Sequence, residues 1–151
     1  AAQFSLPSGV CSDGAGNLFV ADFFNNRIRQ IVIATGVVTT LAGSGATGSA
    51  DGTGAAAQFN RPSGICSDGT GNLFVTDEQN HTIRRVVIAT GVVTTIAGAA
   101  GIAGSTNGTG TAARFNVPVG ICSDGAGNLF VADNSAAIIR RIVIATGVVT
   151  T

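Results

Sequence analysis

Short hydrophobic runs, separated by glycine-rich turns, recur along the whole chain. Val, Ile and Phe dominate these runs, and these residue types favour β-strands. Consecutive runs are joined by DGAGN and ATG, whose Gly, Asp and Asn suit tight hairpins. We therefore predict four strands in the first third of the chain, at residues 9–13, 18–22, 28–34 and 37–42.

One sequence motif occurs three times along the chain. SGVCSDGAGNLFVAD at residues 8–22 returns with small changes at residues 63–77 and 119–133, so the period is 55 and then 56 residues. Each copy is followed by a version of IVIATGVVTT. A fixed period of this length indicates a repeat architecture. We expect three structural units, at residues 1–42, 43–97 and 98–151.

The four runs of each repeat carry apolar residues at successive positions, as in IVIATGVV. Successive apolar residues are typical of strands in a sheet that is covered on both faces. Four antiparallel strands per unit at a fixed period predict an all-β fold, the β-propeller, with one blade per repeat. A parallel solenoid is the alternative, but its repeats are usually about half as long.

The stretches between repeats are rich in Gly, Ala, Ser and Thr. A structureless loop of this length is unusual in a compact domain, so we expect one helical turn at residues 55–59, with Phe59 pointing inward. Arg61 and Val117 each precede a proline, and we expect them to be extended because a residue before proline avoids the helical region.

The phrase P-x-G-[VI], followed by D-G-x-G-N-L-F-V-A-D and N-N-R-I-R, resembles the NHL repeat. The best copy covers residues 7–31, and the connector is similar to that of a bacterial subclass with long connectors. The resemblance implies a β-propeller, most often with six blades. The third copy departs from the pattern, since it reads AAIIR at residues 136–140.

Three blades do not close a ring, and they would leave two apolar blade faces in water. Two chains in head-to-tail contact would supply six blades and cover both faces. We therefore expect a homodimer. Half of a longer natural chain is the alternative. Because the sequence starts in a connector and stops after a fourth strand, we also expect an engineered protein or a half-propeller cut to whole blades.

The three copies differ most between their second and third strands and in the connectors. Alternate loops of an up-and-down sheet lie at the same end, so both variable regions should share one face of the disc. We predict a face that binds a protein, peptide or small molecule. Its residues are Phe23, Phe24, Asn25, Asn26, Arg27, Glu78, Gln79, Asn80, His81, Asn134 and Ser135. Drift in unconstrained loops, or packing of Phe23 inside its blade, is the alternative.

Composition excludes several classes of function. The formal net charge is zero, which argues against nucleic acid as a partner because phosphate binding needs an excess of cations. No run approaches the ~18 apolar residues of a membrane span, so we expect no membrane partner. The sequence has eight arginines and no lysine, so lysine chemistry is excluded.

Candidate chemistry is sparse. His81 is the only histidine, and catalytic triads and zinc sites both need partners. Cys11, Cys66 and Cys122 occupy one position of successive repeats, which predicts small buried residues too far apart for a disulfide. Asp22, Asp77 and Asp133, with Arg29, Arg84 and Arg140, recur as a structural pair.

We expect no cofactor, no metal and no catalytic residue, and therefore a non-catalytic scaffold or binding module. Some propellers of the NHL-like type are metal-dependent lyases or hydrolases, and such an enzyme is the alternative function.

Overall fold

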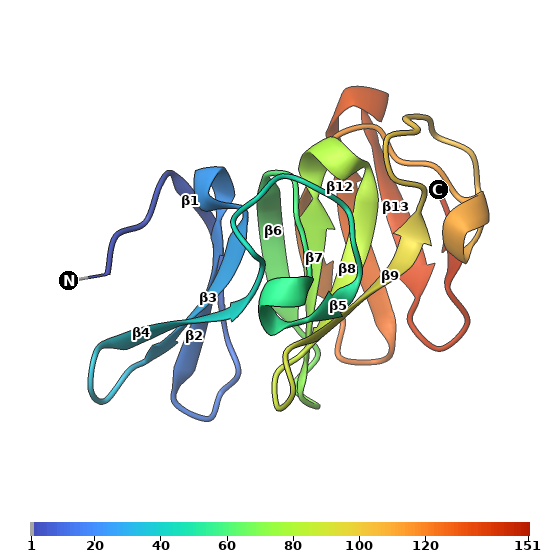
Figure 1. Cartoon of the computed structure of the whole chain (residues 1–151). Coiled ribbons are helices and arrows are strands. Elements are labelled where there is room, and N and C mark those ends of the chain that lie inside the picture. Colours follow the sequence, from blue (N-terminus) through green and yellow to red (C-terminus); the bar gives the residue numbers. More distant parts are fainter. Residues whose placement is uncertain (1) are drawn as a thin grey trace.

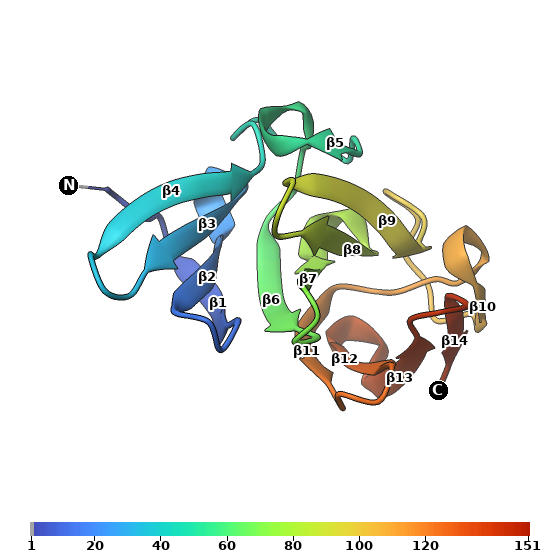
Figure 2. The same ribbon diagram turned by 90° about the horizontal axis from the view of Figure 1, so that it is seen from below.

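The computed structural model describes residues 2–151 and contains three antiparallel sheets in an arc (Figure 1). The first predicted unit begins at Ala1, which lies outside the described residues. The innermost strands of the three sheets lie side by side, and the other strands fan outward (Figure 2). The predicted all-β propeller architecture of one blade per repeat is confirmed.

The first blade has the order β1-β2-β3-β4. Its strands are β1 (Pro7–Ser12), β2 (Asn17–Asp22), β3 (Arg27–Val32) and β4 (Val37–Ala42). The second blade contains β5 (Gly52–Thr53), β6 (Pro62–Ser67), β7 (Asn72–Asp77), β8 (Thr82–Val87) and β9 (Val92–Gly98). The third contains β10 (Gly108–Thr109), β11 (Pro118–Ser123), β12 (Asn128–Asp133), β13 (Ile138–Val143) and β14 (Val148–Thr150).

The second and third blades have five strands, where the sequence predicted four. The additional strands β5 and β10 come from the connectors and pair with the outer edges of β9 and β14. A two-residue strand is enough to cover an edge that would otherwise expose unpaired backbone groups. The predicted strand 28–34 is too long, because the Gly36 N–H donates to the Val32 carbonyl at 2.8 Å and starts a turn there.

Helices are limited to single 3-10 turns among residues 2–151, and none is long or apolar enough to cross a bilayer. Those between the second and third strands are η1 (Phe23–Asn25), η3 (Glu78–Asn80) and η5 (Asn134–Ala136). The connectors hold η2 (Gly54–Ala56) and η4 (Gly110–Ala112). The turn predicted at residues 55–59 therefore ends early, but Phe59 is fully buried as predicted.

Two hydrophobic cores lie between neighbouring blades rather than within one. Between the first and second blades, Phe19 and Ile28 pack with Leu73, Val75 and Val86. The equivalent side chains form the core between the second and third blades. The second blade therefore packs one face of its sheet against the first blade and the other against the third.

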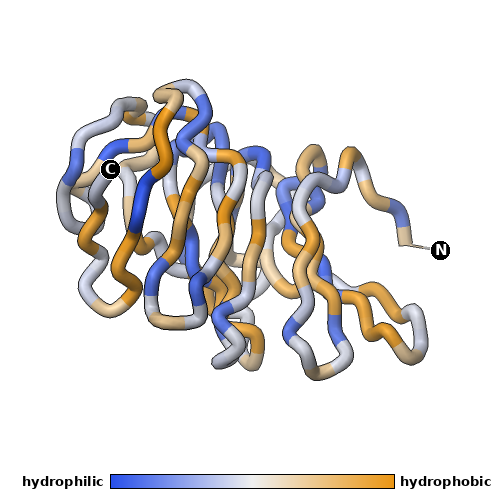
Figure 3. The backbone as a smooth tube through the Cα atoms, turned by 180° about the vertical axis from the view of Figure 1, so that it is seen from behind, coloured by the Kyte–Doolittle hydropathy of each residue, from blue (hydrophilic) through white to orange (hydrophobic). Residues whose placement is uncertain are grey.

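The two outer blade faces have no neighbour, and hydrophobic residues continue along their strands (Figure 3). On the third blade, Phe130 is 36% exposed and Ile139 is 60% exposed, whereas Phe74 and Ile83 at the same positions of the second blade are fully buried. On the first blade, Val10 is 61% exposed and the equivalent Ile65 only 6%. We call the surface around Phe130 and Ile139 the trailing face and the surface around Val10 the leading face.

The innermost strands approach one another closely at a repeated glycine. A Cβ added to Gly9 would lie 2.6 Å from the Ser63 carbonyl oxygen, and one added to Gly64 would collide with that of Val119. The equivalent Cβ on Gly120 would meet only Ala132, at an ordinary 3.6 Å. The first two glycines are required by the adjacent blade, while the third has no blade against it.

Candidate functional site

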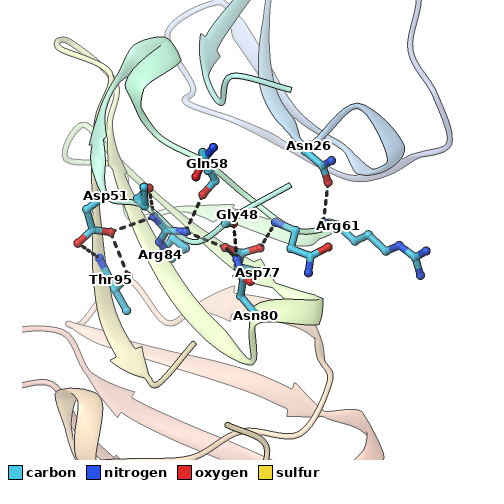
Figure 4. A network of polar contacts seen from close by, with 11 residues as sticks. Asn26, Gly48, Asp51, Gln58, Arg61, Asp77, Asn80, Arg84 and Thr95 are labelled. Carbon is cyan, nitrogen blue, oxygen red and sulfur yellow. Dashed lines mark hydrogen bonds and ion pairs between the residues drawn. The ribbon is translucent and has the colours of Figure 1, made fainter. Parts of the chain in front are cut away.

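A buried ion pair fastens each connector to its blade. In the second blade, Nη1 of Arg84 lies 2.7 Å from Oδ2 of Asp77, and both side chains are fully buried. The other oxygen of Asp77 accepts the Asn60 N–H at 2.7 Å, and Nη2 of Arg84 binds Asp51 at 2.9 Å (Figure 4). The predicted structural role of this recurring pair is confirmed, and the carboxylate also accepts a backbone N–H of the connector.

The same guanidinium groups stack on the buried connector phenylalanines. Arg84 lies 5.1 Å from the ring centroid of Phe59, and Arg140 lies at the same distance from Phe115. Nε of both arginines is buried without a hydrogen-bond partner. The ring beneath each guanidinium compensates part of that cost through a cation–π interaction. The charges of Arg84 and Arg140 therefore serve to stabilise their blades.

Burial raises the pKa of Asp77 to about 6, and the charge of Arg84 together with hydrogen bonds from Asn60 and Asn80 limits that rise. Burial also raises the pKa of Asp133. In the turn at the opposite end of the first blade, the Asn17 side chain donates to Asp13 and lowers its pKa. The shifted carboxylates are therefore parts of ion pairs and turns.

Non-glycine residues with positive φ gather at the end of the disc that carries the predicted ligand face. Asn26, His81 and Ala137 follow the 3-10 turns with φ of 52°, 58° and 54°. The residues before the prolines also have positive φ, 58° at both Arg61 and Val117. The predicted extended conformation of these two residues is wrong, because their N–H groups are turned toward the preceding blade.

Each of those N–H groups meets an acceptor across the blade junction. Oδ1 of Asn26 accepts the Arg61 N–H at 2.9 Å, and Nδ1 of His81 accepts the Val117 N–H at 3.2 Å. These bonds tie one blade to the next at the strained positions. Ala137, at the same position of the third blade, has no side-chain acceptor. The single histidine thus serves as an inter-blade acceptor.

The connector and the loop between the second and third strands meet in a pocket of about 510 Å³ at the first blade junction. This size is within the range of small-molecule sites. We call it the junction pocket. It is lined by Phe24, Asn26 and Gln79, which sequence analysis selected, and by Thr47, Asn60 and Arg61, which it did not. The contrast between Arg61 and its repeat equivalent Val117 is the signal that could have identified Arg61.

The other predicted residues lie near the pocket or apart from it. Phe23 packs edge-on against Phe24, with ring centroids 5.2 Å apart. Asn25 and Asn80 donate to the buried aspartates of their blades. Arg27 donates to the Ser44 carbonyl, and Glu78 accepts from the Gln79 amide. Asn134 and Ser135 are exposed on the third blade, and Asn134 lines a separate pocket on the trailing face.

The cysteine thiols are free, and the thiol of the middle blade is the most buried. Cys66 is buried at the second junction, where burial raises the pKa of its thiol to about 12. Cys11 is half-buried, and burial raises the pKa of its thiol to about 11. Cys122 is exposed on the trailing face, so the prediction that all three thiols are buried is wrong for the chain alone. In residues 2–151, no three His, Cys, Asp or Glu side chains gather in a way that could hold a metal ion.

Comparison with known proteins follows the repeats. The model of the NHL repeat matches residues 4–31 and 59–86. Protein SUPPRESSOR OF QUENCHING 1, chloroplastic, from Arabidopsis thaliana is 32% identical over 149 residues, which cover 93% of this chain and 14% of that protein. NHL repeat-containing protein 2 from Homo sapiens is 34% identical over 146 residues, 89% of this chain and 20% of that protein. The chain thus spans no more than a fifth of these relatives.

Solved structures show the same architecture. A structural genomics protein of unknown function from Bacteroides thetaiotaomicron superimposes with a TM-score of 0.77 at 30% identity, over 83% of this chain and 32% of that one. Virginiamycin B lyase from Staphylococcus aureus does so with a TM-score of 0.64 at 21% identity, over 97% of this chain and 40% of that one. The first and second blades of the chain therefore contain NHL repeats, and its three sheets have the fold of β-propeller blades.

Proposed function

We propose that the chain is a non-catalytic scaffold that joins a second copy of itself head to tail, forms a six-bladed ring, and presents a ligand face around the junction pocket. The observation that carries the proposal is the pairing of an unoccupied trailing face with an unoccupied leading face on one chain. Each carries the residue types that are buried at the two internal junctions. The contact is heterologous, and a rotation that closes after two copies gives a ring.

Residue identity supports the match between the two faces. The trailing face offers Phe130, Ile139 and Cys122, which repeat the Phe74, Ile83 and Cys66 of the second junction. The leading face offers aliphatic equivalents of the partners that those residues meet, namely Val10, Leu18, Val20, Ile31 and Val38. Burying such side chains contributes about 25 cal/mol per Å² of apolar area.

Gly120 gives a second, independent argument. Glycine is needed at Gly9 and Gly64 because an added Cβ would collide with a carbonyl oxygen of the next blade. At Gly120 nothing within the chain requires glycine, since an added Cβ would have ordinary space. A following blade, with the Ser8 carbonyl where Val119 stands relative to Gly64, would supply the reason.

A ligand face, rather than a catalytic centre, agrees with the side chains on that end of the disc. His81 accepts a backbone hydrogen bond, and the buried aspartates are paired with arginines. The resemblance to virginiamycin B lyase, at 21% identity, concerns the fold. No observation favours the lyase or hydrolase alternative.

Light scattering coupled to size exclusion tests the assembly. The expected result is one species at twice the chain mass of 14.9 kDa, unchanged over a hundredfold range of concentration. An Ile139→Asp variant, which places a charge on the trailing face, should elute at the mass of one chain. A wild-type protein that remains folded at 14.9 kDa, or that forms open filaments, would contradict the ring.

A further inference from the structure

We infer that the junction pocket binds the carboxylate group of a small polar ligand, with the Arg61 guanidinium as its recognition group. The inference deepens the ligand-face part of the proposed function and does not depend on ring closure, because the pocket lies wholly between the first and second blades of one chain. It is carried by an arginine that the fold orients and leaves without a partner.

The Arg61 guanidinium is held by aromatic rings. Its central carbon lies 5.6 Å from the ring centroid of Phe24 and 5.9 Å from that of Phe23. The backbone is fixed as well, since its N–H donates to Asn26 and its carbonyl accepts the Glu78 N–H. A stacked guanidinium keeps its N–H edge free, and that edge matches the two oxygens of a carboxylate.

Nothing in residues 2–151 uses that edge. No ion pair or side-chain hydrogen bond of Arg61 occurs among them, and the residue is exposed. The side chain extends away from the polar network that surrounds Arg84 (Figure 4). Arg84 and Arg140, by contrast, each donate to a buried aspartate and to backbone carbonyls. The Arg61 guanidinium therefore has no partner in the described part of the chain that would account for its charge.

The rest of the lining suits an anion with neighbouring hydroxyl or amide groups. The lining contains no carboxylate. Thr47 accepts a hydrogen bond from Asn26, so its own hydroxyl hydrogen is available to a ligand. The side-chain amide of Asn60 forms no hydrogen bond among the described residues, so its oxygen and its nitrogen are both available to a ligand. The backbone N–H of Asn60 donates to Asp77. Glu78, whose N–H donates to the Arg61 carbonyl, accepts with its carboxylate from Gln79 and forms no ion pair with Arg61.

The second junction provides an internal comparison. There Val117 replaces Arg61, Gln79 replaces Phe24, and His81 replaces Asn26. The backbone hydrogen bond across the junction is kept, so the scaffold is the same. The cation and its aromatic support are missing, however. The features that would bind a carboxylate are therefore specific to the first junction rather than part of the repeat.

Titration followed by NMR tests the inference, with the backbone amides and arginine Nε–H groups as reporters. Glucuronate and an N-acetylated dipeptide acid are the carboxylate probes, and glucose and the dipeptide amide are their neutral counterparts. We expect saturable shifts at Arg61 and Asn60 with at least one acid, at millimolar concentration, and at least tenfold weaker binding of its neutral counterpart. The acid that binds identifies a sugar acid or a peptide carboxylate as the source.

Three variants sharpen the test. Arg61→Gln should weaken binding at least tenfold, and Phe24→Ala, which removes one ring, about threefold. Arg141→Gln is the matched control, because Arg141 is exposed and donates to Asn128 at the opposite end of the disc; it should bind as the wild type does. The inference is overturned if no acid shifts Arg61, if Arg61→Gln binds equally well, or if inorganic phosphate binds as tightly as the carboxylates. A change in the mass of the assembly would bear on the proposed ring and not on carboxylate binding.

Discussion

The covered junction between the second and third blades and the bare trailing face of the third blade present the same residues in different surroundings. Phe74, Ile83 and Cys66 are buried at the junction, and Phe130, Ile139 and Cys122 occupy the same positions of the next repeat in solvent. The sheets that carry them have the same register, with Phe74 opposite Arg85 and Phe130 opposite Arg141. The difference lies only in the presence of a following blade.

That comparison shows that the burial of a blade face depends on the neighbouring blade. The apolar face of a propeller blade has no other part of its own repeat to pack against, as in other repeat proteins in which each unit contacts mainly the adjacent units. We therefore propose that the bare trailing face is an interface. The following substitutions compare the contribution of a residue at a covered junction with that of the equivalent residue on the bare face, for stability and for association.

The largest effect is expected from truncating the buried aromatic residue. Phe74→Ala should lower the free energy of unfolding by about 4 kcal/mol, because it leaves a cavity at a fully buried site. Phe130→Ala should cost about 1 kcal/mol or less in a chain that cannot associate, since that ring is already partly in water. Urea unfolding of both variants in an Ile139→Asp background, which is expected to be monomeric, measures the difference. Equal losses would remove the distinction between the two faces.

A methyl group at the close-approach glycine should have the next largest effect. Gly64→Ala should lower the free energy of unfolding by about 3 kcal/mol, because the added carbon collides with the Val119 carbonyl. Gly120→Ala should leave the fold intact and weaken association about a hundredfold, the equivalent of ~3 kcal/mol. Unfolding curves and light scattering give the two quantities. A Gly120→Ala protein that associates as the wild type does would show that no blade follows the third.

An added acceptor should strengthen the closing contact modestly. Ala137→Asn would restore the side chain that accepts an N–H across the first junction, where Asn26 binds Arg61. Its partner in the ring would be the Leu6 N–H, and one such bond contributes about 1 kcal/mol. Sedimentation should show about fivefold tighter association. Ala137→Leu, which adds bulk without an acceptor, is the control, and equal gains from both variants would exclude the hydrogen bond as the cause.

The last prediction concerns pH and the buried carboxyl group of Asp77. Because burial raises the pKa of Asp77 from 3.8 to about 6, the folded chain binds this proton more tightly than the unfolded chain. The stabilising contribution is complete below pH 3.8 and is lost as the pH rises to about 6. The unfolding free energy of the wild type minus that of Asp77→Asn should fall over this interval. A difference that rises with pH would show that the ion pair with Arg84 dominates over burial.

Much of the fold could be predicted from the sequence because the same pattern of strands and turns occurs in three repeats. The strand periodicity and the turn residues identified the blades, and Phe59 was correctly placed inside. The short strands β5 and β10 were not predicted, since Gly-Thr carries no strand signal and pairs only because the edge of the neighbouring β9 or β14 strand needs partners. The same holds for the pre-proline residues, whose positive φ follows from a contact across the junction.

The candidate site was predicted only in part. Comparison of the copies identified the variable loops, and hence Phe24, Asn26 and Gln79. Arg61 was missed because its importance depends on which blade it faces, and local sequence does not report that. Asn80 and His81 were selected for their variability, but their side chains hold the Gly48 carbonyl and the Val117 N–H in place.

The central claim, that the trailing face is covered in the native protein, is tested most directly by the reactivity of Cys122 toward an aromatic disulfide reagent, with each thiol followed by peptide mass spectrometry. We predict that Cys122 of the wild-type protein reacts as slowly as Cys66 and that Ile139→Asp, which is expected to be monomeric, makes Cys122 reactive while Cys66 stays protected. Rapid modification of Cys122 in the folded wild-type protein, with Cys66 still protected, would contradict the account, because it would show the face to be open to solvent.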